Sequence, residues 1–111
     1  MTSIVINIGN TNIRFGHFID GKCDVSWIIN TKPYGTRDEL FAQFSMLYQT
    51  YNVDVEKVDK IIIGSVVPQL THIISSALYK IHGIEAIVVD RKRTLLFIIS
   101  LIKWELIFLP I

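Results

Sequence analysis

Cysteine and charge are both scarce in this sequence. A single cysteine, Cys23, stands among 111 residues, so no disulfide can form within the chain. Charged residues make up 19% of the chain and the formal net charge is +1, which provides no basic field for nucleic acid and no acidic face for cationic partners. Met1 is followed at once by strand-like sequence, so we expect no signal peptide and a reducing, cytoplasmic setting.

Apolar residues, by contrast, are abundant and unevenly spread. They make up 50% of the chain, and the mean hydropathy is +0.43, which is high for a domain of this size. Much of the excess follows Asp90, because residues 95–111 contain few polar side chains. We therefore divide the chain into a lobe with a single core, residues 1–90, and a hydrophobic divergent tail, residues 91–111.

The pattern of the first 90 residues predicts an α/β lobe. Short β-branched or alternating runs predict strands over residues 3–8, 12–19, 24–29, 61–67 and 84–89. Apolar residues at three- and four-residue spacing predict helices over residues 36–51 and 69–82. This order predicts an antiparallel β-meander followed by βαβ units, and hence a mixed sheet covered by helices.

Turn and capping signals support these boundaries. Asp20-Gly21 is a strong hairpin dipeptide between the second and third strands. Thr36, with Glu39 three residues later, is typical of a capping box at the start of a helix. Gly83 follows the second helix, where a left-handed residue commonly ends a helix.

The polar turn after the first strand could bind a phosphate group. Residues 7–12 read NIGNTN, between a buried strand and the strand that returns beside it. Gly9 would let the backbone approach an anion, and Thr11 and Asn12 offer hydroxyl and amide donors at the same corner. The alternative is a plain polar hairpin turn, and spacing alone does not decide between the two.

Three motifs in register resemble successive landmarks of one enzyme family. INIGNTN at residues 6–12, SWIINT at 26–31 and GSVVPQLT at 64–71 resemble type III pantothenate kinases in order and spacing, over residues 1 to about 90. The resemblance implies an actin-like (ribonuclease H-like) lobe and ATP-dependent phosphorylation of pantothenate, the first step of coenzyme A biosynthesis. It also implies ATP, Mg²⁺ and a monovalent cation (K⁺ or NH₄⁺) as cofactors, and a cytoplasmic homodimer.

The same resemblance assigns roles to two segments. The residues expected to line the ATP site are those of the first turn: Asn7, Ile8, Gly9, Asn10, Thr11, Asn12, Ile13 and Arg14. The residues expected to form the floor of the cleft are Ser65, Val66, Val67 and Pro68. The alternative for this second segment is a plain core strand that ends at Pro68, followed by a helix.

The sequence departs from the family pattern in two ways. Asn7 stands where the family carries an aspartate that helps to position magnesium-bound phosphates, so we expect weak metal binding there. Nothing after Asp90 matches the family's Gly-Ala-Asp-Arg stretch with its catalytic aspartate. We therefore expect an incomplete, inactive fragment of the kinase. The alternative is a non-catalytic half-domain that binds a nucleotide or a protein.

The tail admits three interpretations. It could complete the core as a strand or helix, or it could associate with a membrane because basic residues 91–93 flank an apolar run. Spanning is not expected, since a span needs about 20 apolar residues and Lys103 and Glu105 would lie within it. The interpretation we favour is out-of-frame or otherwise divergent coding after Asp90.

The remaining candidate residues indicate no further site. His17, His72 and His82 are far apart and lack partners at metal-ligand spacing, so we expect ordinary surface or sheet histidines rather than zinc ligands. Cys23 has no partnered histidine in view, and we expect an inert thiol. Trp27 is expected to pack in the core, because no basic groove surrounds it.

Overall fold

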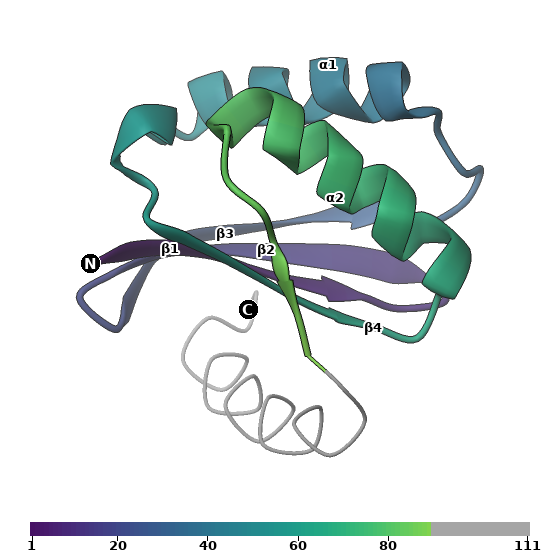
Figure 1. Cartoon of the computed structure of the whole chain (residues 1–111), viewed down its shortest axis with the longest axis horizontal. Coiled ribbons are helices and arrows are strands. Elements are labelled where there is room, and N and C mark those ends of the chain that lie inside the picture. Colours follow the sequence, from purple (N-terminus) through teal and green to yellow (C-terminus); the bar gives the residue numbers. More distant parts are fainter. Residues whose placement is uncertain (90–111) are drawn as a thin grey trace.

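Five strands form one mixed sheet, and two helices lie against the same face of it (Figure 1). The computed structural model describes residues 1–89; the tail, with its three interpretations, lies outside these residues. The elements in chain order are β1 (Thr2–Ile8), β2 (Asn12–Ile19), β3 (Lys22–Asn30), α1 (Arg37–Thr50), the 3₁₀ turn η1 (Val55–Lys57), β4 (Lys60–Ser65), α2 (Pro68–His82) and β5 (Ile87–Val88).

The sheet has the strand order β3-β2-β1-β4-β5. Strands β1, β2 and β3 form an antiparallel meander, and β4 then pairs parallel to β1 and to β5. The predicted meander followed by βαβ units is therefore confirmed. Strand β1 lies in the middle of the sheet, paired on both sides along its length.

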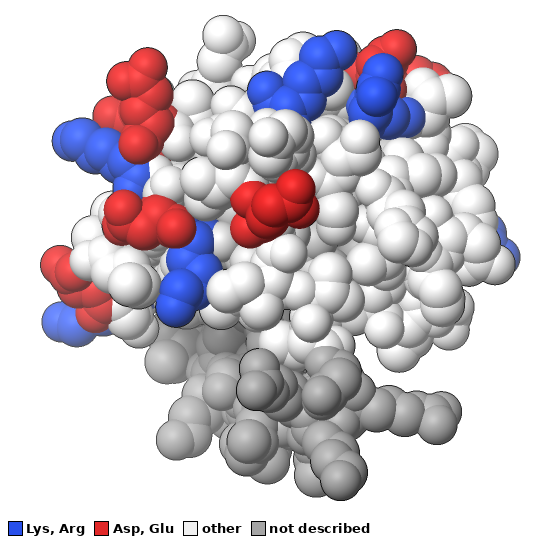
Figure 2. Space-filling model, in the orientation of Figure 1, with Lys and Arg blue, Asp and Glu red and all other residues white. Residues whose placement is uncertain are grey.

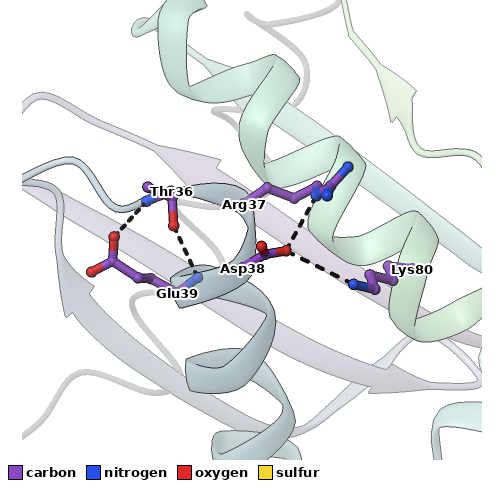
Figure 3. Close-up of polar contacts among 5 residues, drawn as sticks. All are labelled: Thr36, Arg37, Asp38, Glu39 and Lys80. Carbon is purple, nitrogen blue, oxygen red and sulfur yellow. Dashed lines mark hydrogen bonds and ion pairs between the residues drawn. The ribbon is translucent and has the colours of Figure 1, made fainter.

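Local signals in the sequence explain where the elements begin and end. Asp20 and Gly21 have φ of 50° and 80°, the two positive values that a type I′ hairpin turn requires. At the start of α1, the Thr36 hydroxyl accepts from the Glu39 N–H at 3.2 Å, and the Glu39 carboxylate accepts from the Thr36 N–H at 3.1 Å (Figure 3). Gly83, with φ of 72°, ends α2 as predicted.

A surface ion pair joins the two helices next to this cap. Asp38 of α1 lies 3.8 Å from the Lys80 ammonium of α2 and 3.5 Å from the Arg37 guanidinium (Figure 3). The Lys80 nitrogen also lies 5.0 Å from the centre of the Phe41 ring. Because these groups are largely exposed, solvent screens their attraction, and packing of the core holds the helices together instead.

The core lies between the sheet and the two helices. Alternate residues of the strands point toward the helices, and Ile4, Ile6 and Ile8 of β1 are fully buried. Trp27 stacks on Phe15 with ring centres 5.4 Å apart, which confirms that it is a packing residue. The core side chains of α1, Leu40, Phe44 and Tyr48, follow the predicted helical spacing.

The structure corrects the predicted bounds of β4 and β5. Strand β4 ends at Ser65 rather than at residue 67, because the Ser65 hydroxyl accepts from the Val67 N–H at 3.0 Å and bends the chain into α2. Pro68 is therefore the first residue of the helix, where its missing N–H leaves no bond unmade. Strand β5 covers two residues, Ile87–Val88, rather than residues 84–89.

Charged groups of both signs lie interspersed on the face that Figure 2 shows, between broad uncharged areas. This distribution agrees with the small net charge of the chain. Within residues 1–89, no helix is long and apolar enough to cross a membrane.

Candidate functional site

The polar turn lies at the carboxyl end of the central strand. Gly9, Asn10 and Thr11 connect β1 to β2, and the carboxyl end of the parallel strand β4 lies directly beside them. The Val66 N–H donates to the Ile8 carbonyl at 3.0 Å and so extends the ladder between the two strands past their ends. Ligands of open α/β sheets bind at such carboxyl ends.

Gly9 allows the turn to close tightly. Its N–H donates to the Asn12 carbonyl at 2.9 Å, and a Cβ added at Gly9 would lie 3.1 Å from that same oxygen. The sequence suggested that Gly9 gives an anion room to approach. In the structure its small size serves the turn itself, and its N–H is already bonded.

Two backbone donors remain at the tip of the turn. Among the hydrogen bonds of residues 1–89, none uses the N–H of Asn10 or Thr11 as donor. Both residues are exposed, as is Asn12. Consecutive free N–H groups form an anion-binding concavity, and the hydroxyl and amide side chains add further donors. The turn can therefore bind a phosphate without displacing any described hydrogen bond.

Thr31 holds this turn from the next strand. It directly follows β3 and is 2% exposed. Its hydroxyl donates to the Gly9 carbonyl at 2.7 Å, and its own N–H donates to the Thr11 carbonyl at 3.0 Å. From the sequence we gave Thr31 no role in the site, although it ends the SWIINT motif at residues 26–31, because its partner lies 22 positions away.

The residues that flank the turn divide between two faces of the sheet. Ile8 and Ile13 are paired with each other and are 0% and 1% exposed in the core, so their side chains anchor the turn and their backbone alone can reach a ligand. Asn7 and Arg14 are directly opposite each other on the other face and are half-buried. Asn7 is also paired with Gly64 of β4.

The segment expected to form the floor of the cleft also lies at the carboxyl ends of β1 and β4. Ser65 is paired with Ile8, and Val66 is 61% exposed beside the turn. Val67 is 3% exposed and lies in the core, and Pro68 begins α2. The structure thus brings Ser65 and Val66 next to the predicted ATP-binding turn, whereas Val67 packs beneath it.

An open cavity of about 470 Å³ lies behind the turn. Ile13 and Thr31 form the wall that it shares with the turn. The remaining wall includes Lys32, Glu39 and Leu70, from the β3–α1 connection and the two helices. The charged residues of the lining are Lys32 and Glu39, and the Glu39 carboxylate already accepts a hydrogen bond from the cap of α1.

The described residues do not fit a magnesium site. Mg²⁺ in proteins is held by one or two carboxylates together with substrate phosphates. Asn7 offers a neutral amide oxygen, and the residue directly opposite it, Arg14, is a cation. Within residues 1–89, no group of three or more His, Cys, Asp or Glu side chains could hold a metal ion.

The histidines differ from the expectation in one case. His82 is the last residue of α2, and its Nδ1 lies 3.2 Å from the Val55 carbonyl while its Nε2 lies 2.9 Å from the Tyr48 hydroxyl. Nδ1 therefore donates, and Nε2 accepts from the phenol. His17 is buried in β2, with Nδ1 3.1 Å from the Asp24 carboxylate.

Solved structures similar to this chain have the actin-like fold. A ROK hexokinase from Thermus thermophilus superposes with a TM-score of 0.57 at 18% identity, over 80% of this chain and 33% of that one. A Bacteroides thetaiotaomicron protein with an actin-like ATPase fold gives 0.56 at 8%, over 79% and 32%. These likenesses concern the fold alone, and they confirm the predicted fold class.

Related sequences give a narrower result. A protein of Finegoldia magna named type III pantothenate kinase is 42% identical over 89 residues, 80% of this chain and 34% of the relative. One of Kosmotoga olearia with the same name is 37% identical over 70 residues, 63% of this chain and 27% of the relative. The chain thus spans about a third of the length of the curated relatives it matches.

A sequence model of one protein family also matches this chain. The type III pantothenate kinase model matches residues 3–102, which include β1 to β5 and extend past the boundary drawn at residue 90. Since that range takes in most of the chain and agrees with the names of the relatives, the chain belongs to the type III pantothenate kinase family.

Proposed function

We propose that this chain supplies the nucleotide-phosphate-binding lobe of a type III pantothenate kinase. In the whole protein, the γ-phosphoryl group of ATP would pass to pantothenate. The single observation that carries the proposal is the turn at the end of β1, where Asn10 and Thr11 are exposed and their N–H groups donate none of the hydrogen bonds of residues 1–89. The family membership supports ATP as the nucleotide.

The role of this lobe would be positioning. Phosphoryl transfer requires little covalent chemistry from the protein and depends on holding the phosphates and neutralising their charge. The two free N–H groups would bind phosphate oxygens, with the Thr11 hydroxyl and the side-chain amides of Asn10 and Asn12 beside them. Because the described residues do not fit Mg²⁺, no step is assigned to a metal ion. A monovalent cation and a homodimer remain expectations from the family.

One turn of one lobe should bind ATP weakly, because the phosphates meet donors on one side only. A titration of the ¹⁵N-labelled chain with ATP, followed by NMR, tests this. We expect the largest shift changes at the amides of Asn10 and Thr11, with a dissociation constant well above the low micromolar range. Changes spread evenly over the sheet, or none at all, would contradict the proposal.

A charge substitution makes the test specific. Asn10→Asp preserves the size of the side chain and places a negative charge at the turn. It should weaken ATP binding by about fivefold, since like charges 4 Å apart in water repel by about 1 kcal/mol. Asn52→Asp is the matched control, because Asn52 is also exposed but lies between α1 and the start of β4, whereas the turn lies at the end of β4. Equal losses in both variants would point to non-specific charge effects.

The second candidate is a non-catalytic module that binds a nucleotide or a protein. The neutral Asn7 is the observation that favours it, because a nucleotide can bind at the turn without a metal-positioning carboxylate. ATP binding that stays independent of Mg²⁺ even in an Asn7→Asp chain would favour this module over the kinase lobe.

A further inference from the structure

The hydroxyl of Thr31 makes a contact that the fold alone does not require. The backbone of Thr31 continues the β2–β3 ladder, because its N–H donates to the Thr11 carbonyl at 3.0 Å. Its side chain does something different and donates to the Gly9 carbonyl at 2.7 Å, on the other side of the turn. Thr31 therefore binds the carbonyls of Gly9 and Thr11, the residues on either side of Asn10.

The carbonyl of Gly9 has a particular importance in this turn. In a β-turn it would accept the N–H of the residue three positions on, Asn12. That bond is not among those of residues 1–89, and the Thr31 hydroxyl takes its place. The orientation of the Gly9–Asn10 peptide therefore depends on a side chain from another strand.

Because the peptide is planar, the orientation of the Gly9 carbonyl also fixes the direction of the Asn10 N–H. In a trans peptide, the C=O of one residue and the N–H of the next point in opposite directions. Because the Gly9 carbonyl points at Thr31, the Asn10 N–H must point away from it, out of the turn. Glycine places few limits on rotation of this peptide, so the hydroxyl is what selects the direction.

We propose that Thr31 is a positioning residue for the phosphate-binding turn, whose buried hydroxyl fixes the Gly9–Asn10 peptide so that the Asn10 N–H faces a bound phosphate. The proposal rests on the function proposed above and describes how the Asn10 N–H is oriented before a phosphate binds. Thr31 itself does not touch the phosphate, since the residue is 2% exposed and its hydroxyl is bonded to the Gly9 carbonyl.

The test uses three variants of the full 111-residue chain. Thr31→Val removes the hydroxyl and nearly keeps the shape of the side chain, so the Gly9 carbonyl loses this donor. Thr31→Ser keeps the hydroxyl. Thr50→Val is the matched control, because the Thr50 hydroxyl also donates to a backbone carbonyl, that of Met46 at 2.9 Å, far from the turn.

Two readouts separate positioning from folding. The first is ATP affinity by NMR titration. It should fall about fivefold in Thr31→Val, because the loss of one hydrogen bond changes an equilibrium constant by about that factor. It should stay within about twofold in Thr31→Ser and Thr50→Val. The second is the chemical shift of the Asn10 amide without nucleotide. It should change in Thr31→Val alone, while the resonances of β4 and α2 stay in place.

The outcomes distinguish this proposal from the one on which it rests. A parent chain that binds ATP, with Thr31→Val binding equally well, overturns the role of Thr31 and leaves the proposed function standing. A parent chain that does not bind ATP, while the Asn10 amide changes in Thr31→Val alone, overturns the function and retains the fixed peptide. Equal losses in Thr31→Val and Thr31→Ser would show that the packing of Thr31 matters and its hydroxyl does not.

Discussion

At the scale of single residues, Asn7 has the greatest consequence for chemistry. It lies at the end of β1, opposite Arg14 and beside Gly64, on the face of the sheet away from the helices. An amide there is neutral and nearly the same size as the aspartate that the resemblance implies for this position. Compared with that aspartate, Asn7 removes a charge and occupies almost the same volume.

Asn7→Asp should make ATP binding depend on Mg²⁺. Without the ion, the new carboxylate should weaken ATP binding through like-charge repulsion, and with Mg²⁺ it should strengthen binding several-fold, because the ion would bridge carboxylate and phosphate. ATP titrations with and without MgCl₂ measure this, with Asn52→Asp as the control for added charge. An Asn7→Asp chain whose affinity ignores Mg²⁺ would show that this position does not face the phosphates.

His82 makes the stability of the chain depend on pH. Burial lowers the pKa of His82, and the hydrogen bond to Val55 opposes this to a smaller extent. Because the pKa in the folded state lies below the unfolded value of about 6.5, the contribution of His82 is complete above pH 6.5 and is lost as the pH falls through the lowered pKa. Thermal midpoints from pH 8 to pH 5 should fall less in His82→Gln than in the parent. His72→Gln, on the exposed side of α2, is the control and should fall like the parent.

At the scale of elements, the start of α1 is held by two reciprocal hydrogen bonds. Thr36→Ala removes the cap and should lower the free energy of unfolding by about 1 kcal/mol, whereas Thr36→Ser should stay close to the parent. Urea denaturation measures the difference. If Thr36→Ala unfolds at the same midpoint as Thr36→Ser, the cap contributes nothing and the helix depends on its buried face alone.

The elements were predictable because their signals are local. Alternating polar and apolar residues predicted the strands of the meander, and Asp20-Gly21 predicted the hairpin. Thr36 with Glu39 predicted the start of α1, and Gly83 predicted the end of α2. Each signal lies within a few residues of the feature that it predicts. The end of β4 was missed because a side-chain bond from Ser65 overrides an apolar run that would otherwise continue the strand.

The candidate site was predictable only in part, for the opposite reason. The turn itself is contiguous in sequence, so its polar residues could be named. The contacts that shape it are not contiguous: Thr31 reaches Gly9 across 22 positions, and Val66 reaches Ile8 across the parallel ladder. The exact pairing of distant strands decides such contacts, and no local pattern records it.

At the scale of the whole molecule, the purified chain should show no turnover of ATP with pantothenate and Mg²⁺ above a control without protein. Within residues 1–89 the turn has a neutral Asn7 beside it, and the sequence contains no Gly-Ala-Asp-Arg stretch, in which the resemblance places the catalytic aspartate. A coupled assay for ADP measures turnover. Release of ADP that depends on pantothenate would contradict the prediction.

Deleting residues 91–111 should raise solubility and leave the fold of the remaining chain intact. Within residues 1–89, buried side chains already form a core between the sheet and the two helices. The tail sequence is a low-charge apolar segment of the kind that promotes aggregation. Soluble yield and thermal midpoint of residues 1–90 against the full chain decide. A midpoint several degrees lower would show that the tail is part of the folded lobe.

The central place of β1 has a consequence for the thermodynamics of binding. Its amides are bonded to neighbours on both sides, so those of its buried residues should exchange hydrogen only when the whole sheet opens. Two residues further on, Asn10 and Thr11 are exposed, and their N–H groups donate no hydrogen bond within residues 1–89. The chain therefore passes within one turn from its most protected backbone to backbone that solvent can reach. A phosphate that binds there meets donors already ordered by the sheet, so little conformational entropy is lost on association.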